Sequence, residues 1–420
     1  MNGYRRNMVK REWMSGGAAA SESLTVNTVR QRNRASALQF IIRERETTRA
    51  DLARQCGFSA ASAANIVAEL IADGLVSEIG TVSSRGGRPI AVIAPRADGA
   101  FAIGADVGER GVAVELFDLS LRMVDREFRG GGADASPLDI QSDLRGAIDA
   151  LRSRNARRWS SVLGVGLGLP GVVETGADGK QTLYAQSLGW APLAIAQDLG
   201  GDLPLFAENG AKTLARAEMW FGAARGVDHA VVALLGRGVG LGVVSEGQLY
   251  RGAFSSAMEW GHTKISYGGL PCRCGNRGCL EAYIGADALL AAWHSAGGAF
   301  EGSGWHALGA LLAAASTEAP AAQVVDDAIE ALGAALGSVV NLTNPQRVVL
   351  GGWVGLRLME SYAERIADAI RRNALDRAGH QFELVVATFG GDTVALGSAL
   401  MPIEALINAP RISSTASHAM

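Results

Sequence analysis

The chain has 420 residues, of which 48% are hydrophobic and 19% charged, and its formal net charge is −3. Four cysteines are too few for a disulfide framework, which favours a reducing cytoplasm. No apolar run has the length and continuity of a membrane helix, and the basic N-terminus lacks the apolar segment of a signal peptide. We therefore expect a cytoplasmic protein that does not enter a membrane.

Residues 25–97 show the pattern of a winged helix-turn-helix, after a polar, Gly/Ala-rich arm (1–24) that we expect to be disordered. A first helix ends near Glu44, Thr48 can cap a short second helix, and Ser59 can cap a third that ends at Gly74. The apolar face of the third helix is expected to comprise Ile66, Val67, Leu70 and Ile71. Strands over 75–79 and 89–93 follow, joined by a polar tip.

The outward face of the third helix carries small side chains, so this helix can lie deep in the major groove of DNA. The candidate DNA contacts are Ser59, Ala60, Ala61, Ser62, Ala64 and Asn65 on the helix, with Arg85 and Arg88 at the wing tip. Asn65 is suited to adenine, and the arginines to phosphate or the minor groove. Residues 1–100 carry 14 Lys and Arg against 9 Asp and Glu, which also favours a polyanionic partner. A helix-turn-helix used only for protein contacts is the alternative, but it leaves the basic wing without a purpose.

The body, residues 98–408, has the pattern of strands and helices expected of a duplicated α/β protein. Strands are expected at 101–107, 112–118, 121–128, 162–168 and 205–208, with helices at 137–154 and 210–221. The pattern then restarts, with strands at 229–235, 239–246, 248–251, 347–350 and 383–387 and helices at 324–341 and 356–373. We expect a small lobe over about 98–218 plus the C-terminal helix, a large lobe over about 219–394, a cleft between them, and a tail over 409–420.

Three of the four cysteines cluster at Cys272, Cys274 and Cys279, and His262 precedes them by a short loop. Three thiolates and one imidazole form the closed tetrahedral shell that structural zinc prefers, with no position left for a reactive water. Gly275 and Gly278 give the loop the backbone freedom that wrapping a metal requires. Free thiols in a turn-rich loop are the alternative.

The chain resembles the ROK family, the repressors, open reading frames and kinases of sugars. The resemblance runs from about Arg30 to Leu406. It rests on Pro170-Gly-Val-Val173, Leu188-Gly-Trp190, Glu208-Asn209, the glycine repeat 236–242, Glu259-x-Gly-His262, the run 272–281, and Val349-Leu-Gly-Gly352. It implies a two-lobed, actin/hexokinase-like fold built from duplicated ribonuclease H-like units, and dimers or larger oligomers. It also implies a sugar pocket in the cleft, with Asn209, Glu259, His262 and Glu281 as the sugar contacts and His262 also binding zinc.

The chain departs from the family's kinases at positions that phosphoryl transfer needs. In the kinases the residue after the Asn209 position is an Asp that acts as general base, and here it is Gly210. Glu109 and Arg110 alter the first phosphate loop, and Arg237 stands where the second loop usually has Thr. We therefore expect no enzyme activity and no role for ATP, although the arginines leave some affinity for phosphate open.

The sequence thus predicts a DNA-binding transcriptional regulator of carbohydrate genes, most simply a repressor. Its expected partners are double-stranded operator DNA, a sugar effector, and a second or further copies of the chain in a homodimer or homotetramer. Its expected cofactor is structural zinc. Two alternatives stay open: an ATP-dependent sugar kinase fused to a winged helix, and a regulator controlled by a protein partner.

Overall fold

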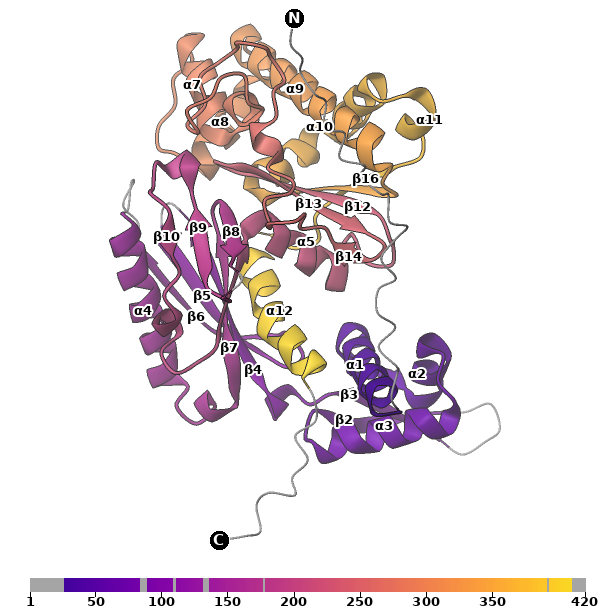
Figure 1. Cartoon of the computed structure of the whole chain (residues 1–420). Coiled ribbons are helices and arrows are strands. Elements are labelled where there is room, and N and C mark those ends of the chain that lie inside the picture. Colours follow the sequence, from indigo (N-terminus) through magenta and orange to yellow (C-terminus); the bar gives the residue numbers. More distant parts are fainter. Residues whose placement is uncertain are drawn as a thin grey trace, which may run out of the picture.

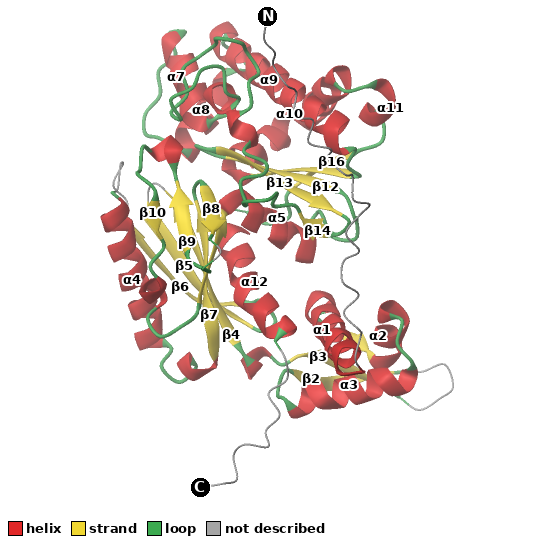
Figure 2. Cartoon of the chain, viewed as in Figure 1, coloured by secondary structure: helices red, strands yellow, loops and turns green. Residues whose placement is uncertain are grey.

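A computed structural model describes residues 26–83, 89–108, 111–130, 136–176, 178–390 and 393–409. In Figure 1 the N-terminal helices and strands form a separate unit at one end of the molecule, beside the end of the long C-terminal helix. The remainder forms two sheet-and-helix lobes, and Figure 2 shows helices flanking the sheets of both.

The N-terminal unit contains the three helices and the two wing strands that were predicted, together with a short strand, β1, that was not. Its helices are α1 (Val26–Glu44), α2 (Arg49–Cys56) and α3 (Ala60–Ala72). Its strands are β1 (Thr47–Thr48), β2 (Val76–Val82) and β3 (Ile90–Pro95), in the order β1-β3-β2.

The predicted caps of the winged helix form. The Thr48 hydroxyl accepts a hydrogen bond from the Asp51 amide at 3.1 Å, and the Ser59 hydroxyl accepts one from Ser62 at 3.1 Å. Gly57 ends α2 in the left-handed region at φ 69°. Leu38, Ile66 and their neighbours form the core, but one prediction is wrong: Ile71 is 36% exposed. Ile71 is the residue directly after Leu70, so its side chain points about 100° further around the helix, away from the buried face.

The first lobe contains a five-stranded sheet in the order β11-β7-β4-β5-β6. Its strands are β4 (Phe101–Gly108), β5 (Gly111–Asp118), β6 (Met123–Gly130), β7 (Val162–Leu169) and β11 (Leu205–Asn209). Helix α4 (Pro137–Arg154) packs on β5 and β6, and α12 (Thr393–Asn408) packs on β4 and β7. A small sheet of β8 (Val172–Thr175), β9 (Gln181–Tyr184) and β10 (Leu193–Ala194) is attached to this lobe.

The second lobe repeats the first. Its sheet has the order β14-β13-β12-β15-β16, so in both sheets a three-stranded antiparallel meander is followed by two parallel strands on the opposite edge. The strands are β12 (Ala230–Leu235), β13 (Val239–Ser245), β14 (Gln248–Leu249), β15 (Arg347–Gly351) and β16 (Glu383–Val386). This identical strand order confirms the predicted duplication and the two-lobed α/β fold.

Helices cover the second sheet on both sides. Helix α5 (Gly210–Phe221) packs on β12 and β13 and also along α12. The others are α6 (Glu281–Ile284), α7 (Ala286–Ser295), α8 (Trp305–Ala314), α9 (Ala319–Thr343), α10 (Gly352–Asn373) and α11 (Asp376–Gly379). Within the described ranges no single helix has the length and apolarity to span a membrane. Helices α8 and α9, bent by 110°, reach that threshold only as a pair, and both contribute to the buried core of this lobe.

Candidate functional site

A pocket of about 430 Å³ opens between the two lobes, and residues from both sheets line it. The first lobe contributes Asp106 and Gly108 from β4 and the Leu169–Gly171 turn. The second lobe contributes the glycine turn between β12 and β13 and the start of α10. The first residues of α5 and α12 complete the wall. This volume lies within the range of small-molecule sites.

All four predicted sugar contacts, Asn209, Glu259, His262 and Glu281, line this one pocket. They come from three separate parts of the chain: the end of β11, the loop after β14, and the start of α6. The fold therefore brings together residues up to 72 positions apart, which gives the pocket two carboxylates, an amide and an imidazole. Such groups can accept and donate hydrogen bonds to several hydroxyls at once.

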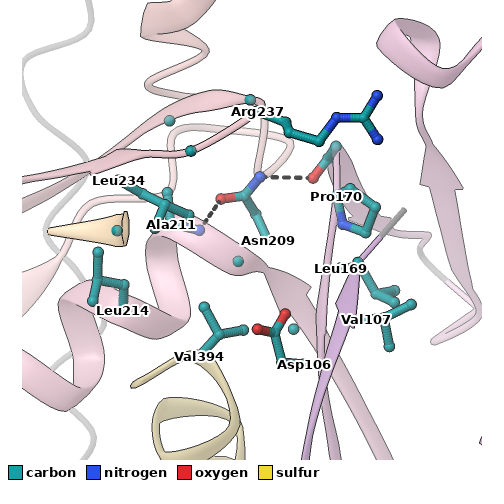
Figure 3. Close-up of a pocket in the computed structure, with 18 of the residues that line it drawn as sticks. Asp106, Val107, Leu169, Pro170, Asn209, Ala211, Leu214, Leu234, Arg237 and Val394 are labelled. Atoms are coloured by element: carbon teal, nitrogen blue, oxygen red, sulfur yellow. Dashed lines mark hydrogen bonds between the residues drawn. The ribbon is translucent and has the colours of Figure 1, made fainter. Parts of the chain in front are cut away.

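Asn209 is held rigidly because it caps α5. Its Oδ1 accepts hydrogen bonds from the amides of Ala211 at 2.9 Å and Lys212 at 3.3 Å, and its Nδ2 donates to the Gly171 carbonyl at 2.8 Å. Figure 3 shows this amide spanning from the start of α5 to the Pro170–Gly171 turn. Since an amide nitrogen has two protons and one goes to Gly171, a second can point to a ligand.

The two glutamates are fixed by different surroundings. Glu281 is 7% exposed, and its Oε2 accepts a hydrogen bond from the Val239 amide at 3.1 Å. Its Oε1 lies 4.0 Å from the Arg273 guanidinium. Burial raises the pKa of Glu259, although the charges of Lys212 and His262 oppose that shift. Both carboxylates are thus partly desolvated, a state in which a hydrogen bond to a ligand hydroxyl is worth more than in water.

The His262 ring faces two sites. Its Nε2 lies 3.1 Å from the Ser187 hydroxyl on the pocket side, and its Nδ1 lies 3.7 Å from the Cys272 sulfur. One nitrogen is therefore placed for the pocket and the other for the cysteine cluster.

His262, Cys272, Cys274 and Cys279 form a cluster that can hold a metal ion. Their ligand atoms lie within 4.8 Å of one another, and the three thiols are free and buried. The sulfurs of Cys274 and Cys279 are 3.8 Å apart. A tetrahedral zinc with bonds of about 2.3 Å places its sulfurs roughly 3.8 Å apart, so the donor set and its spacing fit this ion.

Gly210, where the resemblance to the family's kinases leads us to expect a general base, has room for a side chain. A Cβ added to Gly210 would lie 3.7 Å from the Leu169 carbonyl and 4.0 Å from a Val394 methyl, which is ordinary contact. A steric clash therefore does not explain the glycine at this position. Glu109 and Arg110 lie outside the described residues, and Arg237 pairs with Asp287 at 2.9 Å while lining the pocket.

The candidate DNA contacts on α3 mostly face outward. Ser59, Ala60, Ala61, Ala64 and Asn65 are exposed. Ser62 is half-buried, and its hydroxyl lies 2.9 Å from that of Ser59. Arg85 and Arg88 lie outside the described residues.

Sequence reasoning missed the contribution of two helices that run from the pocket to the winged helix. Thr393 and Val394 begin α12 at the pocket, as Gly210 begins α5. The far ends of both helices, including Trp220 and Ile403, share one hydrophobic core with α1 of the winged helix. Figure 1 shows α12 running from between the lobes towards the winged helix. No local signal marks such contacts, because they join segments that lie far apart in the sequence.

Comparison with known proteins places these features in a family. The model of the ROK family matches residues 102–405. A "Xylose repressor" of Caldicellulosiruptor bescii is 25% identical over 91% of this chain and 98% of its own length. A "Glucokinase" of Halalkalibacterium halodurans is 30% identical over 70% of this chain and 92% of its own length. A solved ROK family transcriptional regulator, a homologue of the E. coli Mlc protein, has a TM-score of 0.72 at 24% identity and covers 90% of this chain and 97% of its own.

Proposed function

The chain belongs to the ROK family, and we propose that it is a DNA-binding transcriptional repressor of carbohydrate genes, released from its operator by a sugar bound between its lobes. The observation that carries the proposal is the pair α5 and α12. Each helix begins at the pocket and ends in the core of the winged helix. The repressor relative is matched over 91% of this chain, whereas the glucokinase is matched over 70% of it, which fits a winged helix added to a ROK body.

In this proposal Asn209, Glu259, His262 and Glu281 bind the hydroxyls of the sugar. The carboxylates accept from hydroxyl groups, and the Asn209 amide donates through the proton that Gly171 does not take. The class of ligand comes from the family, and the support from this chain is that all four side chains line one pocket.

Zinc is the proposed cofactor, with His262, Cys272, Cys274 and Cys279 as ligands. Bound there, it would supply no reactive water, because four protein ligands complete its shell. Its proposed task is to fix the His262 ring, whose Nε2 faces the pocket, and the loop that leads into Glu281. The Lys264 ammonium lies 2.9 Å from the Cys279 sulfur and suits a thiolate there.

The sugar signal is proposed to travel through α5 and α12 as one unit. A Cβ added to Gly397 of α12 would lie 1.9 Å from the Thr213 carbonyl of α5, so the two backbones touch directly. At the other end, the Arg216 guanidinium and the Trp220 indole both donate to Glu404 of α12 at 3.1 to 3.2 Å. Close packing without voids transmits a displacement better than a loose contact does.

Beyond these helices, α1 of the winged helix is tied to the end of α5. The Arg43 guanidinium donates to the Met219 carbonyl at 3.3 Å, and Glu44 pairs with Arg225. A change in the lobes would therefore reorient the winged helix. In a homodimer, two winged helices must match half-sites about 34–36 Å apart or a multiple of this, so a small reorientation releases the operator. The four free cysteines suit a protein of the reducing cytoplasm.

A sugar kinase is the second candidate, because the glucokinase relative shares the ROK body. Gly210 opposes it, since removing a general base typically lowers the rate about 10²–10⁴-fold. ATP is accordingly not part of the proposal.

The test combines ligand screening with DNA binding. A thermal-shift panel of aldoses, amino sugars and sugar phosphates is run on zinc-loaded protein, with and without ATP. A ligand at 100 times its dissociation constant raises the free energy of unfolding by about 2.7 kcal/mol. A sugar that stabilises without ATP and releases DNA supports the proposal, whereas ATP-dependent phosphorylation of that sugar contradicts it.

A further inference from the structure

A second cavity, of about 660 Å³, lies between the winged helix and the body. One wall is the outer face of α1. The other wall is formed by the ends of α5 and α12, by Gly247 in the β13–β14 turn, and by Gln248 and Leu249 of β14. The α1 wall is polar and consists of Thr28, Gln31, Arg32, Ser36 and Gln39, with Ala35 among them. None of the residues that line this cavity lines the pocket between the lobes.

Three arginines and one carboxylate line the cavity, so its local charge is positive. The arginines are Arg32, Arg216 and Arg251, and the carboxylate is Glu404. Arg251 pairs with Glu208 at 2.8 Å, which leaves an excess of positive charge even when that outer carboxylate is included. Arg32 is exposed and makes no hydrogen bond or ion pair with any described residue.

Arg216 has a hydrogen-bond donor that is unpaired within the described part of the chain, which is independent evidence beside the net charge of the cavity. The residue is only 5% exposed, and its Nε lies 3.2 Å from both oxygens of Glu404. Its buried Nη1 has no hydrogen-bond partner among the described residues. Leaving a buried charged donor without a partner is costly, and native proteins rarely do so. The guanidinium thus has hydrogen-bonding capacity that its own protein partner does not use.

We propose that this cavity is a second ligand site, which binds a small anionic metabolite through a carboxylate or phosphate group. Arg32 supplies a cation from the winged helix, and Arg216 and Arg251 supply cations from the body. Oxyanions are the groups that guanidinium forks bind best. The volume suits a ligand of metabolite size.

Such a ligand would change how the winged helix sits on the body. The C-terminal end of α1 is already fixed through Arg43 and Glu44, whereas Thr28, Gln31, Arg32, Ala35, Ser36 and Gln39 line the cavity. An anion held by both walls fixes the N-terminal half of α1 as well. The repressor would then respond to two signals, a sugar between the lobes and an anion beneath the winged helix. Anion and DNA would alter each other's affinity by the same factor.

The test is calorimetric titration of the full zinc-loaded chain, without DNA, with inorganic phosphate and separately with malonate, at constant ionic strength set by chloride. We expect saturable binding of one anion per chain, and the comparison of the two probes distinguishes phosphate from carboxylate chemistry. The variant Arg32→Gln, at an exposed position, should fold normally and bind at least about 10-fold more weakly, since it loses a charge-assisted hydrogen bond to the anion.

Two controls make the outcome decisive. Arg371→Gln removes an exposed arginine of α10 whose one ion-pair partner among the described residues is Asp368, and it should bind the anion as the wild type does. The sugar-induced thermal shift of Arg32→Gln should be unchanged, which separates this site from the sugar pocket. Binding of neither anion, or binding that Arg32→Gln leaves intact, overturns the proposal whether or not the sugar pocket is correct.

Discussion

Replacing Glu281 by Gln tests the sugar pocket with little disturbance of the fold. The Val239 amide now donates to Glu281 Oε2 at 3.1 Å, and a glutamine carbonyl can accept that same bond. The substitution keeps the side-chain volume and removes the charge of a group that is only 7% exposed. We therefore expect the melting temperature without ligand to stay close to that of the wild type.

Sugar binding should weaken much more than stability does. A hydrogen bond to a charged group contributes about 1.5–3 kcal/mol, which corresponds to a loss of about 10- to 150-fold in sugar affinity. By linkage, the sugar concentration that releases half of the DNA should rise by a similar factor, while DNA affinity without sugar stays unchanged. Calorimetry measures the first quantity and fluorescence anisotropy with labelled operator DNA the second. Glu364→Gln, at an exposed position of α10, is the matched control. Wild-type sugar affinity in Glu281→Gln would refute the assignment of this carboxylate.

Three further predictions test the metal, the coupling and the DNA contact. Cys274→Ser should lower zinc content measured by atomic absorption and weaken the sugar response while the chain stays folded; full zinc occupancy would refute the ligand set. Gly397→Ala places a Cβ against the Thr213 carbonyl and should lower the free energy of unfolding by about 1–3 kcal/mol. The control Gly309→Ala in α8, whose Cβ would make only an ordinary contact with the Arg357 side chain, should leave the free energy of unfolding unchanged. Equal melting temperatures for Gly397→Ala and the wild type would contradict the close contact between α5 and α12. Asn65→Ala should weaken operator binding by about 1–3 kcal/mol, equivalent to a loss of about 5- to 150-fold, and leave sugar binding unchanged; unaltered DNA affinity would remove Asn65 from the interface.

Local chemistry made part of this structure predictable. Thr48 and Ser59 are cap residues at the positions where α2 and α3 begin, and each makes its predicted bond. The cysteine spacing marked the cluster before its geometry was known, because the ligand types are rare and close in sequence. The repeated pattern of strands along the sequence likewise indicated two lobes, and the structure has one five-stranded sheet in each.

Other elements gave no clear local signal. The helices α7 and α8 are alanine-rich and short, so their apolar residues do not define one face. The strands β8 to β10 contain only two to four residues each. The packing of α5 and α12 against the winged helix depends on contacts between segments far apart in the sequence, which hydrophobic periodicity cannot reveal. Ile71 was also mispredicted, because a shift of one residue along a helix turns a side chain from the buried face to the exposed one.

The measurement that tests the account most directly is operator binding by the wild-type chain, titrated with the sugar that the thermal-shift panel identifies. The DNA fragment is selected from a random pool by the protein itself, so no operator has to be assumed. We predict that the sugar raises the DNA dissociation constant at least about 5-fold, the lower end of typical allosteric coupling, without ATP and without a phosphorylated product. DNA affinity that no sugar changes, or a sugar that is phosphorylated at the 1–100 s⁻¹ typical of kinases, would contradict a sugar-controlled repressor.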